Sequence, residues 1–127
     1  MAKHTILVVD DEAYILNIMD FSLDSEGFRV ITAANGEEAL RRASELLPDL
    51  IVLDVMMPKV DGFEVCRALK AKKETEKIPI ILLTAKDRES DRKKGEEVGC
   101  NLYMTKPFSP SKLINAVQEL LGLVQAE

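Results

Sequence analysis

The sequence predicts an α/β protein with a doubly wound, five-stranded parallel sheet and helices on both faces. Short apolar runs alternate five times with segments whose apolar residues recur at helical spacing. Several of these runs are apolar throughout, which is typical of parallel strands that helices cover on both faces. The 127 residues are enough for one domain with a substantial core, and no repeat or linker-like stretch divides them. We therefore expect a single domain over residues 1–127.

Composition narrows the class of protein. Hydrophobic residues make up 46% of the chain and charged residues 31%, as in an ordinary globular protein. The apolar runs are too short to span a bilayer and no signal peptide is recognisable, so we expect a cytoplasmic protein without membrane contact. A net charge of −5 argues against direct nucleic-acid binding. Cys66 and Cys100 lack metal-ligand spacing, and free thiols are favoured over a disulfide.

Each strand and helix has its own local signal. Apolar runs mark the strands, and the second of them alternates apolar with polar residues, which indicates a half-exposed strand. Asn or Ser caps two of the helices, and Gly or Pro ends three. The expected elements, in order, are a strand over 5–9, a helix from about residue 13 that ends at Gly27, a strand over 28–33, a helix that Asn35 caps and Pro48 ends, a strand over 50–53, a helix that opens at Asp61 and Gly62, a strand over 78–83, a helix over 87–98, a strand over 102–105, and a helix that Ser109 caps and Gly122 ends.

Two segments are dominated by charge. Residues 70–77 are interpreted as the charged end of a helix and a loop, with a solvated face. The helix over 87–98 is mostly charged and contains Gly95, which costs about 1 kcal/mol relative to Ala in a helix interior. We therefore expect this helix to be held loosely. Its basic residues are interpreted as a solvated helix face: Arg88, Arg92, Lys93 and Lys94.

Strand character predicts the order of the sheet. The continuously apolar strands over 5–9, 50–53 and 78–83 are expected in the centre, and those over 28–33 and 102–105 at the edges. With right-handed crossovers this favours the strand order 2-1-3-4-5. In such a sheet, ligands bind beyond the carboxyl ends of the strands, where the direction of winding reverses between the first and third strands.

Three carboxylates fall at that point. Asp10 and Asp11 follow the first strand, and Asp54 follows the third. Two like charges about 4 Å apart repel by roughly 4 kcal/mol near a protein surface. The cluster therefore predicts a site for a divalent metal, with one carboxylate left to react. The alternative for Asp10 and Asp11 is that they only cap the first helix.

Two residues from other strands are expected at the same rim. Thr84 ends the fourth strand and Lys106 ends the fifth, which adds a hydroxyl donor and a cation. This set suits phosphoryl transfer to a carboxylate: the metal and the lysine neutralise phosphoryl oxygens, the hydroxyl donates to another, and an aspartate attacks. The alternative is a solvated lysine and an ordinary strand-end threonine.

These residues occur in motifs that resemble a response regulator receiver domain of two-component signalling systems, similar to chemotaxis regulators of the flavodoxin-like fold. The likeness covers residues 6–121 and implies a signalling switch rather than a turnover enzyme. The motifs are Val8-Val9-Asp10-Asp11-Glu12, Leu53-Asp54-Val55-Met56-Met57-Pro58, Asp61-Gly62, Leu83-Thr84-Ala85 and Lys106-Pro107-Phe108.

The resemblance implies a role for each acidic residue. Asp54 would be the phosphoacceptor, with the phosphoryl group coming from the phosphohistidine of a histidine kinase or a histidine phosphotransfer protein. Asp11, Asp54 and the backbone carbonyl of Met56 would bind Mg²⁺, and Asp10 would act mainly through a bound water.

The resemblance also implies a switch. Thr84 and Lys106 would contact the phosphoryl group, and Ala85 would leave it room. Thr84 and the aromatic Tyr103 would then move, so that the surface formed by helix 87–98, strand 102–105 and the last helix changes for a downstream protein. A cis bond is expected before Pro107.

The sequence also bears on the partners of this chain. Many DNA-binding members carry acidic residues where this chain has Asn101, Leu102 and Lys112, so the resemblance does not carry their salt-bridged homodimer to this chain. An alternative function with the same fold is a docking module that works without phosphorylation.

Overall fold

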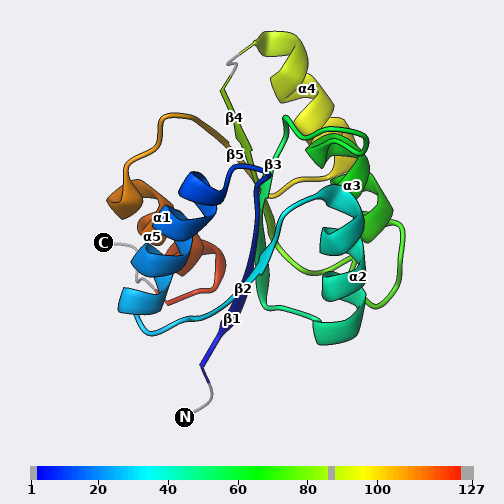
Figure 1. Ribbon diagram of the computed structural model, residues 1–127. Helices are drawn as coiled ribbons and strands as arrows, with labels where there is room; N and C mark the ends of the chain where they lie inside the picture. The colour runs from blue at the N-terminus through cyan, green and yellow to red at the C-terminus, as the bar shows by residue number, and fades with distance from the viewer. Residues whose placement is uncertain (1–2, 86–87, 124–127) are drawn as a thin grey trace.

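The computed structural model describes residues 3–85 and 88–123. A five-stranded parallel sheet of order β2-β1-β3-β4-β5 lies between two layers of helices (Figure 1), as the sequence predicts. The elements are β1 (Thr5–Val9), α1 (Ala13–Ser25), β2 (Arg29–Ala33), α2 (Gly36–Leu46), β3 (Leu50–Asp54), α3 (Gly62–Lys70), β4 (Ile80–Thr84), α4 (Glu89–Val98), β5 (Leu102–Thr105) and α5 (Pro110–Leu120).

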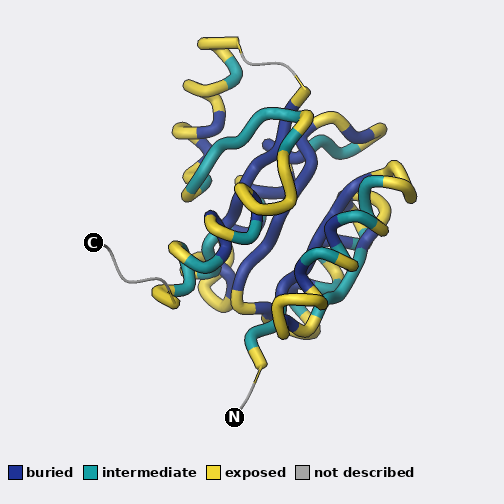
Figure 2. Tube along the Cα trace, turned by 90° about the vertical axis from the view of Figure 1, so that its left-hand side faces the viewer, coloured by how far each residue is buried: buried dark blue, intermediate teal, exposed yellow. Residues whose placement is uncertain are grey.

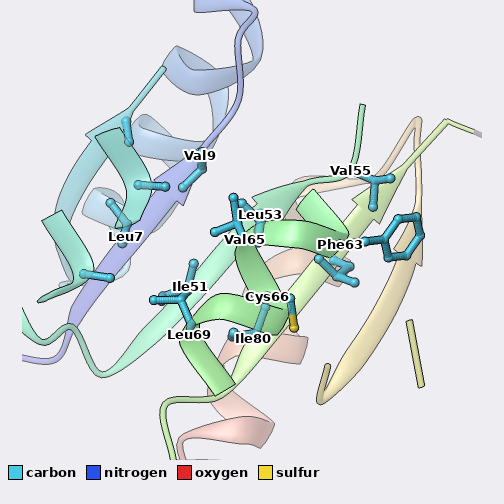
Figure 3. Close-up of a cluster of buried hydrophobic side chains, with 14 of the residues drawn as sticks. Leu7, Val9, Ile51, Leu53, Val55, Phe63, Val65, Cys66, Leu69 and Ile80 are labelled. Carbon is cyan, nitrogen blue, oxygen red and sulfur yellow. The ribbon is translucent and has the colours of Figure 1, made fainter. Parts of the chain in front are cut away.

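The two faces of the sheet build two separate cores, because successive side chains of a strand point to opposite faces. Leu7 and Val9 of β1 pack toward α2, α3 and α4, while Ile6 and Val8 pack toward α1 and α5. Figure 3 shows the first core, in which side chains of α3 lie against those of β1, β3 and β4. Figure 2 shows that the sheet is buried and that the helices carry the exposed residues on their outer faces.

Burial confirms which strands are central. Every residue of β3 and β4 is buried, and so is all of β1 after Thr5. The two edge strands differ: β2 buries only Ala33, and all residues of β5 are half-buried. The continuous apolar runs are therefore the strands with helices on both faces.

The strand bounds differ from the prediction at the fourth strand. β4 begins at Ile80 and not at residue 78, because Ile78 donates its backbone N–H to Thr75 in the preceding turn and Pro79 has no N–H to give. At the other end, Thr84 is part of the strand. In the same way β3 includes Asp54 as its last residue.

Side-chain caps begin three of the helices where the sequence predicts them. Asn35 accepts a hydrogen bond from the backbone N–H of Glu38, and Ser109 accepts one from Lys112. Asp61 and Glu64 form a reciprocal capping box at the start of α3. These caps fix the loops that follow the strand ends on which the site lies.

The solvated face expected over residues 70–77 is wrong for two residues. Thr75 is fully buried and donates its hydroxyl to the backbone oxygen of Leu69, 2.6 Å away. The Lys70 ammonium donates to the backbone oxygens of Glu76 and Ile78, and to Asn101 Oδ1 at 3.1 Å. Burial lowers the pKa of Lys70, and these contacts tie α3 to the starts of β4 and β5.

Helix α4 buries few residues, in agreement with its charged sequence. It begins at Glu89; of the helix expected over 87–98, residue 87 lies outside the described residues. Within Glu89–Val98 only Gly95 and Val98 are buried. Packing explains why residue 95 is a glycine, because a Cβ there would lie 3.2 Å from Cδ2 of Tyr103.

The two cysteines are free thiols, as expected. Cys66 lies in the core on α3, where burial raises the pKa of its thiol to about 12. Cys100 is half-buried just before β5. Neither thiol is poised for reaction at neutral pH.

The Lys70 contacts give a first prediction. Lys70→Met should lower the free energy of unfolding by about 1–2 kcal/mol, because three oxygens lose a donor. Urea denaturation measures the change, and Lys73→Met removes a neighbouring exposed lysine as the control. Equal stability of the two variants would contradict this role of Lys70.

Candidate functional site

Four polar residues meet at the carboxyl edge of the sheet. Asp10 directly follows β1, Asp54 and Thr84 are the last residues of β3 and β4, and Lys106 directly follows β5. The parallel register brings these strand ends to the same level, with Asp54 opposite Leu83 and Thr84 opposite Thr105. The convergence that the sequence predicts is therefore present.

Lys106 bridges the two buried carboxylates. Its ammonium lies 2.9 Å from Asp10 Oδ2 and 3.1 Å from Asp54 Oδ1. Asp10 is fully buried and Asp54 is 2% exposed, while the Lys106 side chain is 13% exposed. The alternative of a solvated surface lysine is thus wrong. Among the residues that the structure describes, one cation faces these two carboxylates, so their negative charge exceeds the positive charge of Lys106.

The first acidic segment adds further carboxylates at the surface. Ligand oxygens of Asp10, Asp11 and Glu12 all lie within 4.8 Å of one another, with Asp11 and Glu12 exposed. Glu12 has no predicted role in the site, although it stands in the motif that carries the resemblance. An all-oxygen donor set at an open rim suits Mg²⁺. The donor atoms of this cluster therefore suit Mg²⁺, but the cluster contains Glu12 and not Asp54, so the predicted ligand set with Asp54 and Met56 stays a prediction.

The helix-capping alternative holds only in part. Asp10 Oδ1 accepts a hydrogen bond from the backbone N–H of Glu12, 2.9 Å away. The N-cap residue of α1 is Glu12, whose own side chain makes no capping bond. Asp10 thus steadies the turn with one oxygen and binds Lys106 with the other, so capping does not account for its position.

Electrostatics single out Asp54. The pKa of the Asp54 carboxyl is raised from 3.8 to about 6, mainly by burial and then by the charge of Asp10, while Lys106 opposes the shift. Burial alone would lower the pKa of Lys106, but its hydrogen bond to Asp10 and the charge of Asp54 raise it overall. A buried carboxylate with a raised pKa beside a lysine is a candidate reactive group.

The remaining predicted residues lie on or next to β3, β4 and β5. Thr84 is buried, Ala85 beside it is exposed, and the Met56 side chain is 54% exposed. Tyr103 is half-buried on β5, and the bond before Pro107 is cis as expected. A hollow of about 530 Å³ between the β3–α3 loop and α4 borders the site, and it is lined by Val55, Met56, Met57, Pro58, Asp61, Phe63, Thr84, Asp91 and Lys94.

Fold and site together define a class of α/β proteins whose acidic residues and lysine meet where the winding of the sheet reverses. Residues 6–118 match the family described as the response regulator receiver domain, and the chain belongs to this family. Receiver domains of this family act in two-component signalling, where phosphorylation works as a switch.

A curated relative and two solved structures illustrate the likeness. The alkaline phosphatase synthesis transcriptional regulatory protein PhoP of Bacillus subtilis (strain 168) is 52% identical over 116 residues, which are 91% of this chain and 48% of that protein. The chemotaxis protein CheY4 of Vibrio cholerae has a TM-score of 0.90 at 34% identity, over 94% of this chain and 99% of that one.

The second structure contains a metal. It is the receiver domain of the sensor histidine kinase PA1611 from Pseudomonas aeruginosa PAO1, with a magnesium ion coordinated in its active-site cleft. It has a TM-score of 0.88 at 33% identity, and the match covers 95% of this chain and 99% of that one.

The chain spans about half the length of the curated relatives it matches. In the described part of the chain, no helix has the length and apolar character to cross a membrane.

The raised pKa of Asp54 gives a second prediction. A carboxyl whose folded pKa lies above its unfolded value stabilises the fold below the unfolded pKa, and this contribution is lost as the pH rises through the folded value. Without divalent metal, Asp54→Asn should therefore raise the free energy of unfolding at about pH 7, by up to roughly 3 kcal/mol, and have little effect at about pH 4.

Urea denaturation in a chelator at several pH values measures this difference. Asp24→Asn, which neutralises an exposed carboxylate of α1, is the matched control. If Asp54→Asn lowered stability at neutral pH, the account of a costly buried charge would be wrong.

Proposed function

We propose that this chain is a phosphoacceptor receiver domain over residues 1–127, in which Asp54 takes a phosphoryl group from the phosphohistidine of a histidine kinase or a histidine phosphotransfer protein. The observation that carries the proposal is the Lys106 bridge between Asp10 and Asp54. It is supported by the family of the chain and by the raised pKa of Asp54. At neutral pH most of this carboxyl is ionised and therefore nucleophilic.

Magnesium is the proposed cofactor. Asp11, Asp54 and the backbone carbonyl of Met56 would hold the ion, and Asp10 would act mainly through a water; the exposed Glu12 lies close enough to Asp11 to join them. When bound, the ion supplies positive charge for the phosphoryl oxygens and for the crowded carboxylates. The oxygen-rich rim supports this choice, as does the magnesium in the PA1611 receiver.

The reaction itself needs little from the protein beyond position and charge. One Asp54 oxygen forms a bond to phosphorus while the bond from phosphorus to the donor imidazole nitrogen breaks, and the electron pair of that bond stays on the nitrogen. The product is an acyl phosphate on Asp54. Lys106, 3.1 Å from Asp54 Oδ1, is placed to donate to a phosphoryl oxygen.

Thr84 and Ala85 take the supporting roles at the end of β4. The Thr84 hydroxyl is proposed to donate to a second phosphoryl oxygen, and Ala85 leaves space for the group because its side chain is small. Asp54 and Thr84 belong to neighbouring strands with every residue buried. Their backbones are therefore fixed before the phosphoryl group arrives.

The output of the switch is proposed to be the surface of α4, β5 and α5. Thr84 would move toward the phosphoryl group and Tyr103 would turn inward, which changes this surface for a downstream protein. In this proposal the chain is a signalling switch and not a turnover enzyme. It would work in the cytoplasm, without direct nucleic-acid binding. A docking module that works without phosphorylation is the alternative.

Phosphorylation gives the third prediction. Incubation with acetyl phosphate and Mg²⁺ should add one phosphoryl group, about 80 Da, because Asp54 supplies the nucleophile. Intact-mass spectrometry measures the product. Asp54→Asn should remain unmodified, while Asp24→Asn should be modified like the parent protein.

Three outcomes decide between the two functions. Equal modification of Asp54→Asn would show that another residue is the acceptor. No modification of the parent protein would favour the docking module. Modification that persists in a chelator would contradict the proposed need for magnesium.

A further inference from the structure

Helix α4 contacts an aromatic ring on each side through a basic side chain. The guanidinium of Arg92 lies 5.3 Å from the centroid of the Tyr103 ring in β5. The ammonium of Lys94 lies 5.0 Å from the centroid of the Phe63 ring in α3. Both distances are within the range of a cation–π interaction, about 6 Å. The interpretation of this basic face as only solvated is therefore wrong for Arg92 and Lys94.

The Tyr103 ring meets α4 at a second point. Gly95 is buried, and a Cβ at this position would lie 3.2 Å from Tyr103 Cδ2 and 3.3 Å from Cys100 Sγ. Both distances are tighter than most real Cβ contacts, so a side chain at this position would require the ring or the thiol to shift by a few tenths of an ångström. Arg92 and Gly95 are one turn apart on α4 and thus form a cradle for this ring.

These contacts matter because α4 buries little apolar surface of its own. Only Gly95 and Val98 are buried within the helix, and the hollow of about 530 Å³ lies between its N-terminal half and Thr84. An element with so little buried apolar surface is a natural participant in a two-state equilibrium. The Tyr103 ring is therefore one of the contacts that hold α4 in place, beside Val98 in the core and the contact of Lys94 with Phe63.

We propose that Arg92 is a positioning residue for Tyr103. With Gly95 it holds the ring against α4, so that the ring position and the helix position change together. The inference rests on the proposed function, in which Tyr103 moves when Asp54 is phosphorylated. Arg92 then influences the equilibrium between the two positions of Tyr103 and α4, although it lies outside the phosphorylation site.

The composition of the chain allows a direct test. It has two tyrosines and no tryptophan, and Tyr14 is 71% exposed on α1. In a Tyr14→Phe background, intrinsic fluorescence therefore comes from Tyr103 alone. Quenching by acrylamide, a neutral probe, then measures how accessible this ring is.

Arg92→Gln should raise the acrylamide quenching constant of Tyr103, because the population of outward ring positions rises by about two- to five-fold when a cation–π contact is lost. Lys93→Gln removes the adjacent exposed cation and should leave the constant unchanged. Arg92→Lys keeps a cation and should restore most of the parent value. Gly95→Ala, whose methyl group crowds the ring, should raise the constant as well.

The same variants are then treated with acetyl phosphate and Mg²⁺. Arg92→Gln should change the initial rate of phosphorylation by a similar factor, while Lys93→Gln should not. An unchanged quenching constant in Arg92→Gln, or an equal rise in Lys93→Gln, would overturn the proposal. If no variant is phosphorylated, the proposed function fails, yet the quenching result still decides whether Arg92 positions the ring.

Discussion

The structure depends on one lysine that lies between two buried carboxylates. Asp10 and Asp54 come from adjacent strands and have almost no contact with solvent, while Lys106 reaches both from the end of the edge strand. Within residues 3–85 and 88–123, the one positive charge of Lys106 does not balance these two carboxylates and the exposed acids beside them. The burial of Asp54 would be costly without a further cation, and this cost makes the site a natural place for a metal and for chemistry that needs one.

The fold delivers this arrangement and keeps it from relaxing. Parallel strands bring their carboxyl ends to one edge, and the helices on both faces bury β3 and β4 completely. Asp54 is the last residue of β3, and Asp10, just after β1, donates its backbone N–H to Ala33 of β2, so these two carboxylates cannot move apart to dilute their charge. The contrast with α4 is large. Within that helix only Gly95 and Val98 are buried, and Arg92 and Lys94 lie over aromatic rings, so the part proposed to respond has little buried apolar surface.

Most of the fold and the centre of the site could be predicted from the sequence, because both follow from local patterns. Continuous apolar runs identified the central strands, and the residues at their ends identified Asp10, Asp54, Thr84 and Lys106 as neighbours. The roles given to these residues, and to Asp11, Met56, Ala85 and Tyr103, remain proposals.

What the sequence did not predict are contacts between segments far apart in the chain. The Lys70 ammonium and its partner Asn101 meet only because α3 ends beside the start of β5. Gly95 looked like a source of weakness in a helix, but its packing against Tyr103 gives it a second role. The charged sequence of the helix predicted that Arg92 and Lys94 lie on a solvated face, and only the fold places aromatic rings next to them.

The most direct test of this account is the ionisation of Asp54 itself. Carbon-detected NMR can follow the Asp54 carboxyl through a pH titration of the metal-free protein and again with Mg²⁺. We expect a midpoint near the pKa of about 6 without metal, and a lower midpoint once Mg²⁺ is bound, because a nearby cation favours the ionised form. A midpoint at the ordinary value of 3.8, unmoved by Mg²⁺, would contradict the claim that this edge of the sheet holds uncompensated negative charge.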